Sequence, residues 1–173
     1  MPTVLSTVLD HFDCVAVVAA GIFAGTALYM TIGEVPALRE FGLEEQWRFF
    51  PYMYQRAAKS QSAFTAIAGI AGIAHGSSIV GAPFYRNLWI AAGSTFLGVL
   101  PYTVICMLDT YKIILDDNKR IKLNNQSQYD NNKKREILDK WVTLHLVRTA
   151  STVLSFGAMI FGLSQHQSLT LGW

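Results

Sequence analysis

The stretch Asn87–Leu108, which reads NLWIAAGSTFLGVLPYTVICML, contains no Asp, Glu, Lys or Arg. About 20 apolar residues in a helix are enough to cross the roughly 30 Å of hydrocarbon in a bilayer. A helix of the same length in a water-soluble bundle would carry a polar stripe for its solvent face, and this stretch has none. It therefore predicts a membrane-spanning helix rather than a helix of a soluble four-helix bundle.

Three further segments share this character. Cys14–Gly33 and Ser60–Tyr85 contain no Asp, Glu, Lys or Arg, and Arg148 is the one such residue within Trp141–Ser164. The chain of 173 residues is 15% charged, whereas a soluble domain has about a quarter of its residues charged. We therefore expect a single all-α membrane domain, an up-down antiparallel four-helix bundle with helices at about 14–33, 60–85, 87–115 and 136–164.

Two long connections separate these helices, and they contain most of the Lys and Arg residues. The positive-inside rule places both connections in the cytosol and both termini on the lumenal or extracytosolic side. The sequence does not decide whether this membrane belongs to the endoplasmic reticulum or to mitochondria. In 34–59 aromatic residues alternate with basic ones, which predicts an amphipathic segment lying in the headgroup region. In 116–135 Asn, Gln and Lys dominate, so we expect a mobile loop.

Polar residues in or beside the spans collect at the cytosolic helix ends, which an antiparallel bundle brings together. His145 and Arg148 are three residues apart and share a helical face with Trp141. An Arg inside a span should face the bundle or pair with a carboxylate, and Asp109 and Glu34 are the available carboxylates. The other polar or aromatic residues of this region are Tyr29, Tyr54, Arg56, Gln61, Thr103 and Thr110.

His75 lies about 20 Å from the cytosolic helix ends and cannot share a ligand with His145. Its role stays open between a functional residue and a hydrogen-bonded structural one. The sequence contains no Cys-x-x-Cys, no P-loop and no Gly-x-Gly-x-x-Gly, and no helix carries two histidines at ligand spacing. We therefore expect no metal, no nucleotide cofactor and no nucleic-acid partner.

Taken together, these residues resemble the anthrone oxygenase-like family of small four-helix membrane proteins. The matching motifs follow the family's order: 21–29 (GIFAGTALY) with Glu34-Val-Pro36, then Tyr54-Gln-Arg56 and Gln61, then Pro101-Tyr-Thr103 with Asp109-Thr110, and finally Trp141-x-x-x-His145-x-x-Arg148. The resemblance implies a cofactor-independent oxygenase that converts lipid-soluble aromatics such as anthrones or hydroquinones with O₂.

An anthrone reacts with oxygen once it is deprotonated, so the chemistry needs a base and a group that stabilises an oxyanion. We expect His145 to be the base, Arg148 to hold the oxyanion, and Asp109 or Glu34 to orient the imidazole. Tyr29, Tyr54 and Trp141 would form the walls of the substrate site, which Arg56, Gln61, Thr103 and Thr110 would complete.

The alternative is a non-catalytic membrane subunit or scaffold in which the same polar residues form a structural network. A homo-oligomer or a larger membrane complex is compatible with either interpretation. An enzyme needs a pocket of several hundred Å³ beside His145 that is open to the bilayer or the cytosol, whereas a scaffold should have these side chains bonded to one another with no cavity. The presence or absence of such a pocket therefore distinguishes the two.

The predicted topology can be tested at the glycosylation sequon Asn125-Gln126-Ser127. A cytosolic loop never meets the glycosylation machinery, so we expect Asn125 to carry no sugar when the protein is made in eukaryotic cells. Mass spectrometry with and without enzymatic deglycosylation measures this. A glycan on Asn125 would place the second long connection in the lumen and reverse the topology.

Overall fold

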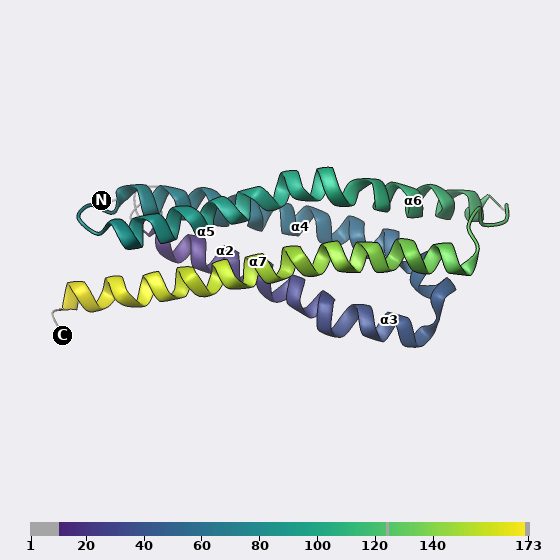
Figure 1. Ribbon diagram of the computed structural model, residues 1–173, viewed down its shortest axis with the longest axis horizontal. Helices are drawn as coiled ribbons and strands as arrows, with labels where there is room; N and C mark the ends of the chain where they lie inside the picture. Colours follow the sequence, from purple (N-terminus) through teal and green to yellow (C-terminus); the bar gives the residue numbers. More distant parts are fainter. Residues whose placement is uncertain (1–10, 124, 172–173) are drawn as a thin grey trace, which may run out of the picture.

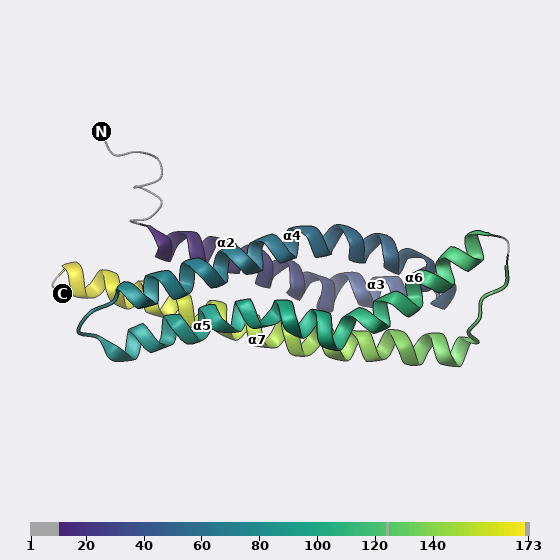
Figure 2. The ribbon, with the colours of Figure 1, turned by 90° about the horizontal axis from the view of Figure 1, so that it is seen from above.

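The computed structural model of the chain describes residues 11–123 and 125–171, with side chains up to residue 165. This part contains four continuous helical rods and no strand, so the protein is all-α as predicted (Figure 1). The rods run alternately in opposite directions, and the segments 79–82 and 123–130 connect the last three of them (Figures 1 and 2). The predicted antiparallel bundle is confirmed.

The first rod consists of α2 (Phe12–Tyr29), the π-helical turn η1 (Met30–Glu34) and α3 (Val35–Phe41). Gly42, at φ 118°, ends this rod in a backbone conformation that favours glycine. The second rod is α4 (Leu43–Ser78). The third joins α5 (Pro83–Tyr102), the π-helical turn η2 (Thr103–Met107) and α6 (Leu108–Lys122), and the fourth is α7 (Asn131–Leu171).

Three of the rods are long and apolar enough to cross a membrane, over Phe12–Phe41, Pro83–Lys122 and Asn131–Gln165. The predicted span at 60–85 is not among them, and α4 ends at Ser78. Polar residues within α4, such as Gln61 and His75, lower its hydropathy. Its place in the bundle therefore follows from packing against its neighbours, above all α5, rather than from its own hydropathy.

Segment 34–59 is helical and not a loop, which corrects that part of the sequence-based expectation, while its position in the headgroup region stays a prediction. Residues 35–41 continue the first rod, and residues 43–59 form the first half of α4, which passes through Pro51 without ending. The loop predicted at 116–135 is also shorter than expected. It is limited to 123–130, because α6 ends at Lys122 and α7 begins at Asn131. Tertiary packing of these amphipathic segments extends the helices beyond the limits that hydropathy suggests.

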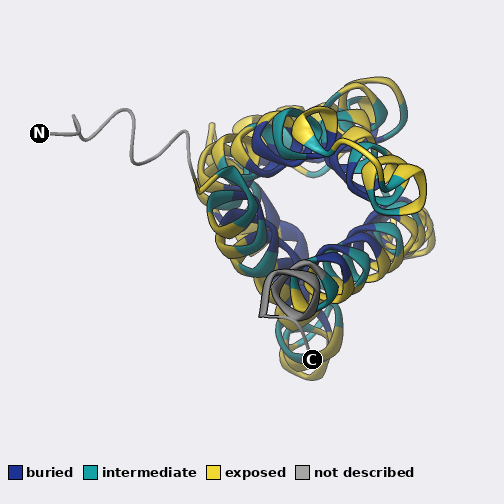
Figure 3. Ribbon diagram, turned by 90° about the vertical axis from the view of Figure 1, so that its left-hand side faces the viewer, coloured by how far each residue is buried: buried dark blue, intermediate teal, exposed yellow. Residues whose placement is uncertain are grey.

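The bundle has an apolar half and a polar half with separate cores. At 40 residues, the third rod is about 60 Å long, roughly twice the hydrocarbon thickness of a bilayer. The core of the apolar half is built around Phe23, Trp89 and Phe96, and that of the polar half around Trp47 and Trp141. Along both halves the buried faces turn toward the bundle axis and the exposed faces outward (Figure 3).

A buried carboxylate holds the connection between α6 and α7 in the polar half. Asp117 accepts hydrogen bonds from Trp47 Nε1 at 2.9 Å, from Ser127 Oγ at 2.7 Å and from the Gln128 backbone N–H at 2.7 Å. Lys134, which is also buried, forms an ion pair with Glu44 across α4 and α7. The short connection is thus tied to the bundle by charged hydrogen bonds.

Close contact between α4 and α5 depends on glycine. A Cβ at Gly93 would lie 2.8 Å from the Ile73 backbone N and 2.9 Å from the Gly69 carbonyl O, while a Cβ at Gly98 on the same helix would meet nothing within 4 Å. Because backbone atoms of packed helices cannot move aside cheaply, a methyl group at position 93 must separate the two helices.

We expect Gly93→Ala to lower the free energy of unfolding by about 1–3 kcal/mol and Gly98→Ala to change it by no more than about 1 kcal/mol. Thermal unfolding in detergent micelles, followed by circular dichroism, measures both variants. Equal melting temperatures for the two would show that α4 and α5 do not meet at Gly93.

Candidate functional site

The two halves of the bundle meet at a buried polar cluster on α7. His145 and Arg148 lie on its inward face, with 1% and 7% of their surfaces exposed. Gln61 of α4 is also buried there. Three residues in a helix correspond to nearly one turn, so the two α7 side chains lie one above the other. The structure thus brings together His145, Arg148 and Gln61, as the sequence predicts.

Arg148 is held by side chains from two helices. Its Nη2 donates hydrogen bonds to Gln61 Oε1 at 3.1 Å and to His145 Nδ1 at 2.9 Å. The guanidinium carbon lies 5.7 Å from the centre of the Phe23 ring, within the range of a cation–π contact. Arg148 Nε is buried without a hydrogen-bond partner in the described part of the chain. The guanidinium is therefore fixed on one side and open on another.

The hydrogen bonds of His145 define its tautomer. Nδ1 lies against an Arg148 N–H and must accept, so the ring proton belongs on Nε2, which is 3.2 Å from the carbonyl O of Ala27. The imidazole also stacks on Trp141, with ring centres 4.9 Å apart and planes inclined by 6°. Both ring nitrogens are thus engaged, and His145 holds Arg148 in place.

The carboxylate partner that we expected for this cluster is not present. Asp109 is exposed on α6, Glu34 is half-buried, and the ion pairs found among residues 11–123 and 125–165 include neither Asp109, Glu34 nor Arg148. Both carboxylates come at or after a π-helical turn. Such a turn inserts one extra residue and rotates the rest of the rod by about 100°, which a sequence read as regular α-helix cannot anticipate.

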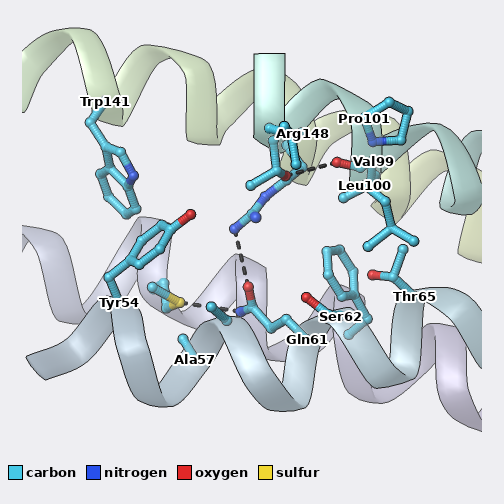
Figure 4. Close-up of a pocket in the computed structure, with 15 residues that line it drawn as sticks. Tyr54, Ala57, Gln61, Ser62, Thr65, Val99, Leu100, Pro101, Trp141 and Arg148 are labelled. Carbon is cyan, nitrogen blue, oxygen red and sulfur yellow. Dashed lines mark hydrogen bonds between the residues drawn. The ribbon is translucent and has the colours of Figure 1, made fainter. Parts of the chain in front are cut away.

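A pocket of about 310 Å³ lies beside Arg148 between α4 and α5 (Figure 4). Its volume is at the lower end of the range typical of small-molecule sites. Of the predicted site residues, Tyr54, Gln61, Thr103, Trp141 and Arg148 line it; the other lining residues are Phe23, Met30, Ala57, Ala58, Ser62, Thr65, Val99, Leu100, Pro101 and Val104. Its walls are mostly apolar, and Arg148 is the one charged lining residue.

Several predicted site residues lie outside this pocket. Tyr29 is 66% exposed, with its ring over Gly33 on the outer side of its own helix. Arg56 is exposed, and Thr110 is buried in the polar half. The structure therefore does not bring Tyr29, Arg56, Thr110, the two carboxylates or the expected base His145 into the pocket.

Other residues of the pocket and of the polar cluster beside it were not found by sequence reasoning. Thr65 is fully buried one helical turn beyond Gln61, and spacing of four residues on α4 was the signal that could have revealed it. The Ala27 carbonyl and Met30, whose sulfur accepts a hydrogen bond from Gln61 Nε2 at 3.3 Å, carry no such signal. The role of Ala27 depends on how α2 lies against α7, and that of Met30 on how η1 lies against α4.

The two π-helical turns flank the site. Met30 of η1 and Thr103 of η2 both line the pocket. Pro101 just before η2 removes one backbone donor, and the hydroxyl of Thr103 donates to the Val99 carbonyl O at 2.8 Å. Short π-helical segments of this kind often occur at functional sites, because they displace side chains from the regular helical phase.

Comparison with known proteins adds one finding to this geometry. A sequence model of the anthrone oxygenase family matches residues 50–158, more than half of the chain. The matched region runs from α4 into α7 and includes Tyr54, Gln61, His145 and Arg148. No curated protein and no solved structure matches the chain. With a family match over this length, the chain belongs to the anthrone oxygenase family.

Proposed function

We propose that this protein is a cofactor-independent, oxygenase-like membrane enzyme that acts on a lipid-soluble aromatic of the anthrone or hydroquinone type with O₂. Arg148 carries the proposal: it is a buried cation that lines an apolar pocket and has no carboxylate partner in the described part of the chain. An uncompensated buried charge costs free energy. An anion in the pocket would offset that cost.

The deprotonated form of such a substrate provides this anion. Loss of a proton from an anthrone leaves an electron-rich enolate whose negative charge is largely on oxygen. In the proposal that oxygen lies against Arg148, whose fixed positive charge favours the enolate over the neutral ketone. The enolate carbon then combines with O₂, and the resulting peroxide anion takes up a proton to give a hydroperoxide, which loses water to leave a second carbonyl. One oxygen atom enters the quinone and the other leaves as water.

His145 and Gln61 contribute to this step by positioning Arg148. The two acceptors hold Nη2 from different helices, so the guanidinium cannot turn away from the pocket. Preorganised charge is effective because it needs no rearrangement when the substrate ionises. A role for His145 as the base stays a prediction, as does any role for Asp109, and the bond from Arg148 to Nδ1 favours positioning.

The substrate would enter from the bilayer. Ser62, Pro101 and Val104 line the pocket between α4 and the third rod and are themselves exposed. The third rod is one of the helices long and apolar enough to cross a membrane. A ligand dissolved in lipid can therefore reach Arg148 without passing through water.

The alternative is a scaffold in which the cluster of His145, Arg148 and Gln61 only joins helices. Its mutual hydrogen bonds suit that function, but a scaffold has no use for an apolar pocket beside an unpaired guanidinium. The pocket together with membership of the anthrone oxygenase family therefore favours an enzyme.

Replacing Arg148 tests the proposal directly. We expect Arg148→Met to lower kcat/KM for anthrone oxidation by about 10²–10³-fold, the usual loss for an oxyanion-stabilising group. Oxygen consumption and quinone absorbance, measured with reconstituted protein, report the rate. Arg86→Met, an exposed site at the other end of the bundle, serves as the control and should keep wild-type rates. Unchanged turnover in Arg148→Met would refute the assignment.

Two variants distinguish a positioning role of His145 from a role as the catalytic base. His145→Asn places an amide oxygen near the position of Nδ1 and keeps an acceptor for Arg148, whereas His145→Ala removes it. A positioning role predicts that the Asn variant retains most activity and that the Ala variant loses at least about tenfold. A base role predicts that both variants lose activity alike, because neither side chain can take up a proton at neutral pH. The pH dependence of kcat/KM provides a second readout.

A further inference from the structure

Three buried hydrogen-bonding groups around the pocket have no partner in the described part of the chain. They are Thr65 Oγ1, Trp141 Nε1 and Arg148 Nε. In folded proteins nearly all buried polar atoms are hydrogen-bonded, and an exception calls for a specific cause. Three such groups from two helices around one cavity point to a ligand that satisfies them.

The three groups are spread along the pocket. Thr65 is one turn from Gln61, about 6 Å toward the apolar half, and Trp141 is two turns from Arg148, about 10 Å toward the polar half. In Figure 4, Trp141 and Thr65 lie on opposite sides of Arg148. A ligand that meets all three must therefore be elongated, with one polar atom near its middle and one toward each end.

The free hydrogen-bonding capacity of the pocket consists mainly of donors. The N–H groups of Trp141 and Arg148 can only donate. Burial raises the pKa of the Tyr54 phenol, so its hydroxyl, which points toward Arg148 (Figure 4), keeps its proton. The amide oxygen of Gln61 already accepts from Arg148. The complementary ligand presents acceptor oxygens.

We propose that Thr65 and Trp141 are specificity-determining residues that, together with Arg148, recognise acceptor oxygens at both ends and in the middle of a flat polycyclic ligand. This recognition rests on the function proposed above. It means that the pocket binds ketone, quinone and enolate forms in preference to an unsubstituted ring system of the same shape. The quinone product then competes with the substrate for the same donors.

Equilibrium binding without oxygen tests the recognition apart from turnover. Full-length protein in lipid nanodiscs is titrated under nitrogen with a radiolabelled anthraquinone that carries one hydroxyl group at the far end of each outer ring, so that it has acceptor oxygens at both ends and in the middle. The comparison ligand is anthracene, which has the same three rings and no oxygen. We expect anthraquinone to bind at least about tenfold more tightly. Thr65→Val and Trp141→Phe should each weaken anthraquinone binding by about three- to tenfold and leave anthracene binding unchanged.

Matched controls separate lost donors from lost packing. Thr152 is fully buried, as Thr65 is, but it lies outside the pocket and its hydroxyl already donates to the Arg148 carbonyl O, so Thr152→Val should bind anthraquinone nearly as wild type does. Trp89 Nε1 is likewise buried without a partner but lies outside the pocket, so Trp89→Phe should also have no effect. Thr65→Ser keeps the hydroxyl and should retain affinity even if the valine variant fails to fold.

Three outcomes would overturn the recognition. The first is equal affinity for anthracene and anthraquinone, and the second is equal losses of affinity in Thr65→Val and Thr152→Val. The third is displacement of anthraquinone by laurate at the same concentration as by an anthrone, which would indicate a lipid site. Because binding is measured without O₂, protein that binds anthraquinone as expected but consumes no oxygen with anthrone would contradict the proposed enzyme and leave the recognition standing.

Discussion

A single positive charge at the boundary between the two halves of the bundle explains most of the site. Burying the guanidinium of Arg148 without a carboxylate is unfavourable, and the fold compensates in part with two hydrogen-bond acceptors and an aromatic face. The side that remains open faces an apolar pocket. The same charge that weakens the empty bundle would strengthen binding of an anion there.

The cluster also couples the helices to one another. His145 connects α7 to the carbonyl of Ala27 on α2, and Gln61 connects α4 both to Arg148 and to Met30. These contacts add directional polar bonds to the apolar packing of the helices, which has little directional preference. The polar bonds therefore fix the rotation and height of the helices around the pocket, while the close approach at Gly93 fixes their separation.

Sequence patterns predict one part of the site well. His145, Arg148 and Trp141 share a face because they lie three and four residues apart on a regular helix, and the structure keeps them together. Asp109 and Glu34 were expected beside them and lie elsewhere. The difference lies in the π-helical turns, since one inserted residue changes which face of the rod a later side chain occupies.

The sequence by itself determined that the chain is a four-helix membrane bundle with a polar cluster on its last helix. Long uncharged stretches and i, i+3 spacing are local properties that need no knowledge of neighbouring helices. Only the tertiary structure decided that Arg148 has no carboxylate partner in the described part of the chain and that 34–59 is helical. It also decided that Thr65 and Trp141, each with a buried hydrogen-bonding group that lacks a partner there, line one pocket. These features depend on how distant helices rotate and approach one another, and hydrophobic patterning leaves that choice open.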